Sequence, residues 1–182
     1  MLTPSRLVLL LTTLAMTQLM ADSIKEDAAV SGRDEYKTEF WGAEKLRDNK
    51  VGWAADMVGQ ANLSDELKSE RFHWSADTKW LWTEDQKIHR VIITVPEDVG
   101  DFCAVPIAVK IFALKPQGNP TVSEDFDEVC SADIIPNESN EEARYSGGKS
   151  IAFEFDSVEV RALRIVCGHP SSWCRVSEID FE

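Results

Sequence analysis

The chain has 182 residues, 28% of them charged and 43% hydrophobic, with a formal net charge of -13. An acidic surface of this kind repels phosphate backbones and anionic headgroups, which argues against nucleic acid and anionic lipid as partners. Neutral sugars, cations and basic proteins stay compatible with it, and the acidity also serves solubility.

The N-terminus has the pattern of a secretory signal peptide. Arg6 precedes an apolar run over residues 7–16, which is shorter than the roughly 20 residues needed to span a bilayer. Ala21 is a small residue at which a peptidase could cut, although Leu19 is larger than such sites prefer. We therefore expect a signal peptide over 1–21 and a secreted, extracellular protein without a membrane span; a buried N-terminal helix is the alternative.

The rest of the chain has the length of one domain. Residues 22–35 are polar and are predicted to be a loose N-terminal segment. Residues 36–182 remain for a single domain, which at this size buries a core without help from a metal or a disulfide.

The elements expected along that domain are mostly strands. A short helix is expected over residues 63–71, and from Trp80 onward the pattern becomes β. Residues 116–149 are expected to be mostly loop, with Cys130 and room for a short strand inside. A break in alternation at Val176 predicts a bulge or a strand start. Strands are predicted over 90–95, 107–114, 150–155, 161–166 and 176–181. Short strands separated by turn signals predict an all-β fold, an antiparallel sandwich or jelly roll.

The four cysteines are expected to form disulfides, because a secreted chain meets an oxidising compartment. Three connectivities are possible. The short separation of Cys167 and Cys174 favours them as a local pair, which leaves Cys103 with Cys130. Zinc spacing is absent from the sequence. Two sequons, at Asn62 and Asn137, would accept N-glycans in a secreted chain.

The order of several segments resembles the discoidin family, also called the coagulation-factor type C domain, within the galactose-binding-like jelly rolls. The segments are Ala43 to Asn49 with Trp53, Lys79 to Trp82, Val91 to Ile93, Arg161 to Ile165, and Ser177 to Phe181. Together they cover roughly residues 36–182. The early loop lacks the glycine common between Asp and Asn in the family, and all four cysteines lie in the C-terminal half, so the resemblance is to a divergent member.

This resemblance implies a structural Ca²⁺ ion. Asp48, Asn49 and Glu178 fall at the positions that calcium-binding relatives use, and calcium prefers oxygen ligands. A solvated turn and an unrelated surface glutamate are the alternative.

Aromatic and polar residues in loops suggest a sugar site, since such sites place flat aromatic faces beside a few polar groups. Of the six tryptophans, Trp80 and Trp82 share one phase of a strand and are expected in the core or on a sheet face. The ligand-binding candidates in loops are Trp53, a cluster of Arg71, His73 and Trp74, and a second cluster of His169 and Trp173. Ordinary packing or surface is the alternative for both clusters.

Catalytic motifs are missing from the sequence, including H-E-x-x-H, G-x-S-x-G and a phosphate-binding glycine loop. The chain is therefore expected not to be an enzyme. We expect a secreted recognition module that binds glycans or extracellular glycoproteins through loops at one end of a sandwich. An extracellular protein–protein adhesion or matrix component without a sugar site is the alternative.

Overall fold

Two long antiparallel strands, β3 (Trp74–Glu97) and β7 (Gly147–His169), organise the molecule. The computed structural model describes residues 24–32, 43–47, 57–59, 72, 74–97, 103–134 and 147–182. The strand predicted over 90–95 lies within β3, and those predicted over 150–155 and 161–166 both lie within β7. Alternating β-branched and aromatic residues explain why these segments extend.

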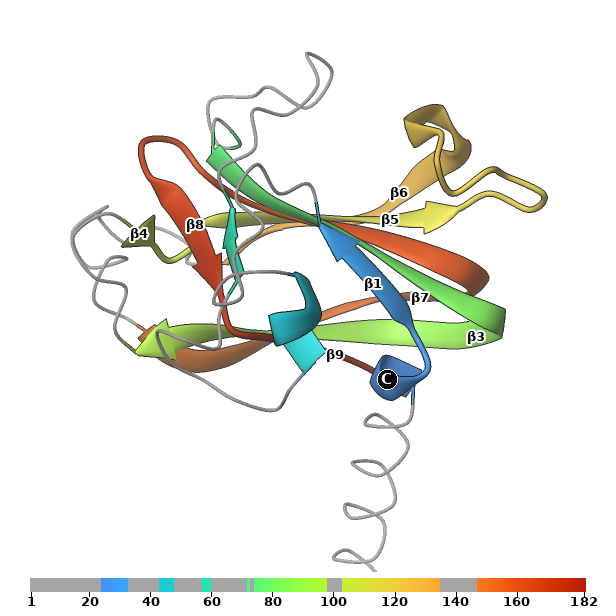
Figure 1. Cartoon of the computed structure of the whole chain (residues 1–182), viewed down its shortest axis with the longest axis horizontal. Coiled ribbons are helices and arrows are strands. Elements are labelled where there is room, and N and C mark those ends of the chain that lie inside the picture. The colour runs from blue at the N-terminus through green and yellow to red at the C-terminus, as the bar shows by residue number, and fades with distance from the viewer. Residues whose placement is uncertain are drawn as a thin grey trace, which may run out of the picture.

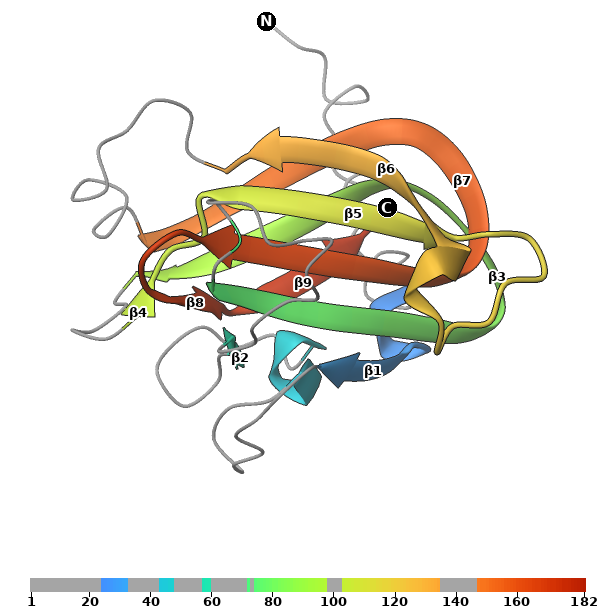
Figure 2. The ribbon, with the colours of Figure 1, turned by 90° about the horizontal axis from the view of Figure 1, so that it is seen from above.

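Both long strands pass from one layer of the molecule to the other. The register between them shifts between Leu81 and Gln86, and again between Ile88 and Arg90. Residues 78–81 of β3, before the first shift, pair with β1 (Ala29–Gly32). The part of β7 opposite this stretch pairs with β5 (Ala108–Leu114), and β5 pairs with β6 (Phe126–Asp133). Residues 91–94 of β3, after the second shift, pair with β9 (Glu178–Phe181). One six-stranded sheet thus supplies two layers, which Figures 1 and 2 show from two directions.

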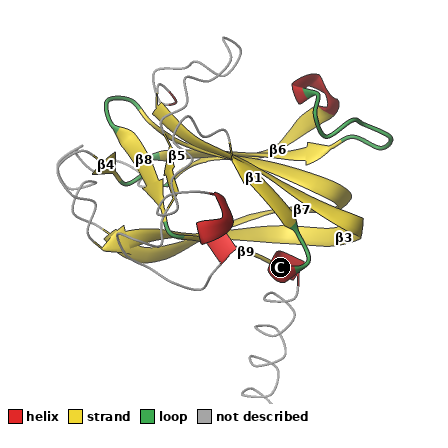
Figure 3. Cartoon of the chain, in the orientation of Figure 1, coloured by secondary structure: helices red, strands yellow, loops and turns green. Residues whose placement is uncertain are grey.

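A smaller three-stranded sheet lies at one end, in the order β2 (Met57–Gly59), β8 (Trp173–Val176), β4 (Cys103–Ala104). Helical structure in the described residues is limited to residues 24–26, Phe72 and two short 3-10 segments, η1 (Ala43–Arg47) and η4 (Ser123–Asp125) (Figure 3). In these ranges no helix is long and apolar enough to cross a membrane. The predicted antiparallel all-β class is confirmed.

The core lies between the layers and is built on aromatic contacts. Trp80 is fully buried and Trp82 nearly so, as predicted from their shared phase. Both meet the Phe181 ring edge to face, with centroids 4.8 and 5.3 Å away. The predicted phase break is also present, because β8 ends at Val176 and β9 begins at Glu178. The closing strand therefore holds the two layers together.

The described part of the segment predicted to be loose, residues 24–32, packs one side against the sheet. Strand β1 pairs with β3, and the Trp82 indole N–H donates to the Ile24 carbonyl at 2.7 Å. Lys25 has no exposed surface. Its polar composition was misleading because the residues that β1 pairs with lie 46 to 52 positions away in sequence, from Gly32 with Thr78 to Ala29 with Leu81. Strand β6, which contains Cys130, is the short strand expected inside the 116–149 segment.

The predicted disulfides are not formed in the structure, because Cys130 and Cys167 both carry free thiols. Cys167 lies inside the six-stranded sheet, in register with Ala76 and Val109, whereas Cys174 lies in the three-stranded sheet. Burial, and then the charge of Asp77, raise the pKa of the Cys167 thiol to about 12, so it is an unreactive core group.

Candidate functional site

Of the two predicted ligand clusters, the structure describes His169, Trp173 and the backbone of Trp74, and these lie at the same end of the sandwich. The backbone of Trp74, at the start of β3, is in register with His169, at the end of β7. Trp173 opens β8 beside Cys103. We call this the β8 end, defined by Trp74, His169 and the loop to Trp173 (Figures 1 and 2). Trp53, Arg71, His73 and the side chain of Trp74 lie outside the described residues, as do both sequons, Asn62 and Asn137.

The loop from His169 to Trp173 is a fixed corner. His169 is 3% exposed, and its Nδ1 accepts hydrogen bonds from the backbone N–H groups of Ser171 at 3.2 Å and Ser172 at 3.0 Å. An Nδ1 that accepts carries no proton, so the neutral imidazole has its hydrogen on Nε2. Trp173 is half-buried and packs against the main core. His169 therefore fixes the shape of the loop through these two hydrogen bonds, and Trp173 remains partly exposed.

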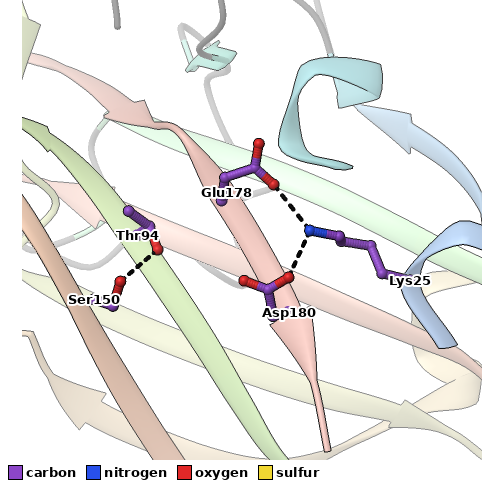
Figure 4. Close-up of polar contacts among 5 residues, drawn as sticks. All are labelled: Lys25, Thr94, Ser150, Glu178 and Asp180. Carbon is purple, nitrogen blue, oxygen red and sulfur yellow. Dashed lines mark hydrogen bonds and ion pairs between the residues drawn. The ribbon is translucent and has the colours of Figure 1, made fainter. Parts of the chain in front are cut away.

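Glu178, the calcium candidate, instead faces a buried ammonium group. Lys25 Nζ lies 3.1 Å from Glu178 Oε2 and 2.6 Å from Asp180 Oδ1 (Figure 4). Strand β9 directs both carboxylates to one face because they are two residues apart. The side chains of Lys25, Glu178 and Asp180 are 1%, 7% and 21% exposed. We call these three residues the ammonium centre.

The charges of the ammonium centre support one another. Burial alone would lower the pKa of Lys25, but the hydrogen bond and charge of Asp180, followed by the charge and hydrogen bond of Glu178, outweigh it and raise this pKa above 10.5. The lysine is therefore charged at neutral pH and neutralises one of the two carboxylates.

This geometry tests whether Glu178 fits a calcium ion. A calcium ion about 2.4 Å from Oε2 would lie within about 5.5 Å of the ammonium nitrogen and would be repelled by it. Glu178 as described thus fits an ammonium partner. Asp48 and Asn49 lie outside the described residues, so calcium at their loop stays a prediction. Within the described ranges, no group of three or more His, Cys, Asp or Glu side chains could hold a metal ion.

A second buried ion pair lies on the outer face of the other layer. Arg164 Nε and Nη2 donate to the two oxygens of Asp77 at 2.9 and 2.7 Å, and each residue is 5% exposed. The Arg164 guanidinium also lies 5.8 Å from the centroid of the Phe112 ring. Arg164 belongs to the strand that carries the family resemblance, and the structure gives it a structural partner.

A cleft of about 410 Å³ lies at the opposite end of the molecule. We call this the hairpin end, after the connection over residues 115–125 between β5 and β6. The cleft is lined by the end of β5, the turn that follows it, a bend in β7 and one residue of β3: Asp85, Leu114, Lys115, Pro116, Gln117, Gly118, Glu159, Val160 and Arg161. Sequence reasoning identified neither this cleft nor Lys25. KPQG signalled a turn, but nothing in the sequence indicated that β7 would bend beside it.

No protein-family model and no curated protein matches the sequence. Solved structures do match its fold. The CpGH89CBM32-5 domain of Clostridium perfringens, solved with GalNAc-β-1,3-galactose, is 9% identical with a TM-score of 0.58 over 86% of this chain and 96% of that one.

Two further structures extend this likeness. The family 32 carbohydrate-binding module of C. perfringens NanJ, solved with galactose, is 12% identical with a TM-score of 0.58, over 86% of this chain and 94% of that one. A fucolectin from striped bass (Morone saxatilis) serum is 14% identical with a TM-score of 0.57, over 87% of this chain and 47% of that one. The chain thus has the galactose-binding-like jelly-roll fold.

Proposed function

We propose that the chain is a secreted carbohydrate-recognition module that binds glycans or extracellular glycoproteins through the loops of the β8 end. The observation that carries this proposal is the likeness, over 86% of the chain, to domains solved with GalNAc-β-1,3-galactose and with galactose. The rigid corner at His169 supports it, because a loop that is already ordered loses little entropy when it binds.

The proposed role is binding rather than catalysis. Matched domains such as the NanJ module are carbohydrate-binding modules by name. Within the described residues the β8 end has a half-buried tryptophan, Trp173, and a buried histidine, His169, whose Nδ1 accepts hydrogen bonds from the loop backbone. An aromatic face with polar neighbours suits a pyranose ring.

A glycan microarray probed with the full chain, expressed from residue 1 in secretory cells, tests the proposal. Dose-dependent signal on a related group of glycans, weakened at least tenfold by Trp173→Ala with the fold retained, is the expected result. The control is Leu81→Ala, which changes a side chain 38% exposed on β3, away from the β8 end. A folded protein that binds no glycan would refute the sugar proposal. N-terminal sequencing of the secreted product tests cleavage near Ala21.

Protein–protein adhesion is the second candidate, favoured by one specific observation. His169 is buried and Trp173 half-buried, so the described part of the β8 end offers less open aromatic surface than a sugar platform would. Capture of extracellular proteins by the immobilised chain, before and after enzymatic deglycosylation, separates the two functions. Capture that survives deglycosylation favours adhesion, and capture that disappears favours sugar recognition.

A further inference from the structure

The cleft at the hairpin end combines a small apolar floor with an open polar rim. Leu114 at the end of β5 and Val160 in β7 are 8% and 6% exposed, and both contribute to the lining. Asp85, Glu159 and Arg161 are exposed charged residues around them. Its volume, about 410 Å³, falls within the range of small-molecule sites.

The turn over residues 115–118 places an unusual backbone in this cleft. The Gly118 N–H donates to the Lys115 carbonyl at 2.9 Å, and between them stand Pro116 and Gln117. Gln117 has a φ of 63°, the left-handed region, which a turn of this pattern normally fills with glycine or asparagine. Any other residue is strained there, and such strain is concentrated at functional sites. Because Gln117 also lines the cleft, this turn makes its side chain the first candidate for contact with a ligand.

The turn is held in place before any ligand arrives. The Asn119 N–H donates to Asp125 Oδ2 at 2.7 Å, and the Lys115 N–H donates to the Asp125 carbonyl at 2.8 Å. Lys115 Nζ donates to the Glu124 carbonyl at 2.7 Å, so its ammonium is committed to the hairpin. From the neighbouring strand β3, Lys79 Nζ donates to the Pro120 carbonyl at 3.0 Å. The Gln117 amide is thus presented on a rigid support, which reduces the entropic cost of binding.

The rim groups are available to a ligand. Among the described residues, the side chains of Asp85, Gln117, Glu159 and Arg161 make no hydrogen bond or ion pair with one another or with other protein groups. Two carboxylates supply acceptors, one guanidinium supplies donors, and the amide supplies both. A ligand in the cleft would therefore find hydrogen-bond partners for both its donor and its acceptor groups.

The mixture of groups points to the class of ligand. The lining carries two carboxylates, Asp85 and Glu159, and two cationic side chains, Lys115 and Arg161, so it favours neither an anion nor a cation. A neutral hydroxylated ring satisfies all four rim groups, because each hydroxyl both donates and accepts, while its apolar face covers the floor. We propose that this cleft binds one neutral sugar residue and gives the module a second site at the end opposite to the β8 end. The choice of a sugar rests on the proposed function.

The test uses the variant Gln117→Gly. Glycine adopts the left-handed backbone without strain, so the melting temperature should be unchanged or higher, whereas a merely structural glutamine would lower it when removed. ¹⁵N-labelled full chain is titrated with galactose and, separately, with N-acetylgalactosamine, followed by two-dimensional NMR. We expect chemical-shift changes at Gln117, Gly118 and Arg161. The affinity for the sugar, fitted from the residues of the cleft, should fall at least tenfold in Gln117→Gly and in Arg161→Ala. Lys87→Ala, an exposed β3 residue outside the cleft lining, is the matched control and should leave affinity unchanged.

The outcomes separate this proposal from the proposed function. Shifts confined to the β8 end, unaffected by Gln117→Gly, would overturn the second site and leave the recognition function intact. If neither sugar changes any chemical shift and the microarray shows no bound glycan, both the second site and the recognition function are overturned.

Discussion

Replacing Lys25 with methionine tests how far the ammonium centre stabilises the fold. Methionine keeps an unbranched side chain of similar length, so the main change is loss of the positive charge between Glu178 and Asp180. Two carboxylates, 7% and 21% exposed, would then face each other without a counter-charge. Breaking a buried ion pair by removing one partner costs about 3–5 kcal/mol, and because water reaches Asp180 we expect the lower end, about 3 kcal/mol. For a chain of this size that lowers Tm by about 6–12 °C.

The free energy of unfolding would be measured by urea titration, followed through the fluorescence of the buried tryptophans. Lys110→Met is the matched control, because Lys110 Nζ lies 2.8 Å from Glu128 Oε2 on the surface, with the two side chains 28% and 41% exposed. Lys110→Met should lower the free energy of unfolding by less than about 1 kcal/mol. Adding Glu178→Gln and Asp180→Asn to Lys25→Met should recover most of the loss, since no buried charge is then left unpaired. If Lys25→Met and Lys110→Met cost the same within about 0.5 kcal/mol at equal m-values, the buried ammonium contributes no more than a surface pair and the reasoning is refuted.

Three further results are expected. Asp77→Ala should lower the free energy of unfolding by about 3–5 kcal/mol, because Arg164 loses both of its 2.9 and 2.7 Å bonds while 5% exposed; a cost under about 1 kcal/mol in urea titration would contradict this. Stability should fall as pH rises above about 9, since the Cys167 thiol loses its proton near its ordinary pKa of 9.0 when unfolded but only at about 12 when folded. The stabilisation from Lys25, whose folded pKa is raised, is likewise present below 10.5 and lost at higher pH. Melting curves of the wild type and of Cys167→Ala from pH 7 to about pH 11 check this, and a flat wild-type curve would count against it. EDTA should change Tm by less than about 1 °C, because Lys25 already neutralises Glu178; a drop of several degrees that added Ca²⁺ restores would instead support the predicted calcium loop.

The sequence predicted those features whose cause is local. Alternation along single strands was enough to place Trp80 and Trp82 in the core and to locate the break between β8 and β9, because each depends on residues within one strand. The order of weak segments was enough for the fold, because a jelly roll depends on the order and spacing of its strands.

Features that depend on distant contacts were missed. Lys25 is polar and lies in a polar segment, and its burial follows from carboxylates 153 and 155 residues further along the chain. The predicted disulfides relied on closeness in sequence, whereas sheet pairing places Cys167 and Cys174 in different sheets. The cleft at the hairpin end forms because residues 159–161 of β7 lie beside the turn at Gln117, and a contact between segments so far apart in sequence leaves no periodic signal.

The central claim, that this jelly roll recognises carbohydrate, is tested most directly by calorimetric titration of the full chain with the strongest glycan from the microarray. The account predicts saturable binding with a stoichiometry above one for a glycan that binds separately at each end, reduced to about one by Gln117→Gly and weakened at the remaining site by Trp173→Ala. The absence of heat or saturation for a chain whose melting curve shows it folded would contradict the claim.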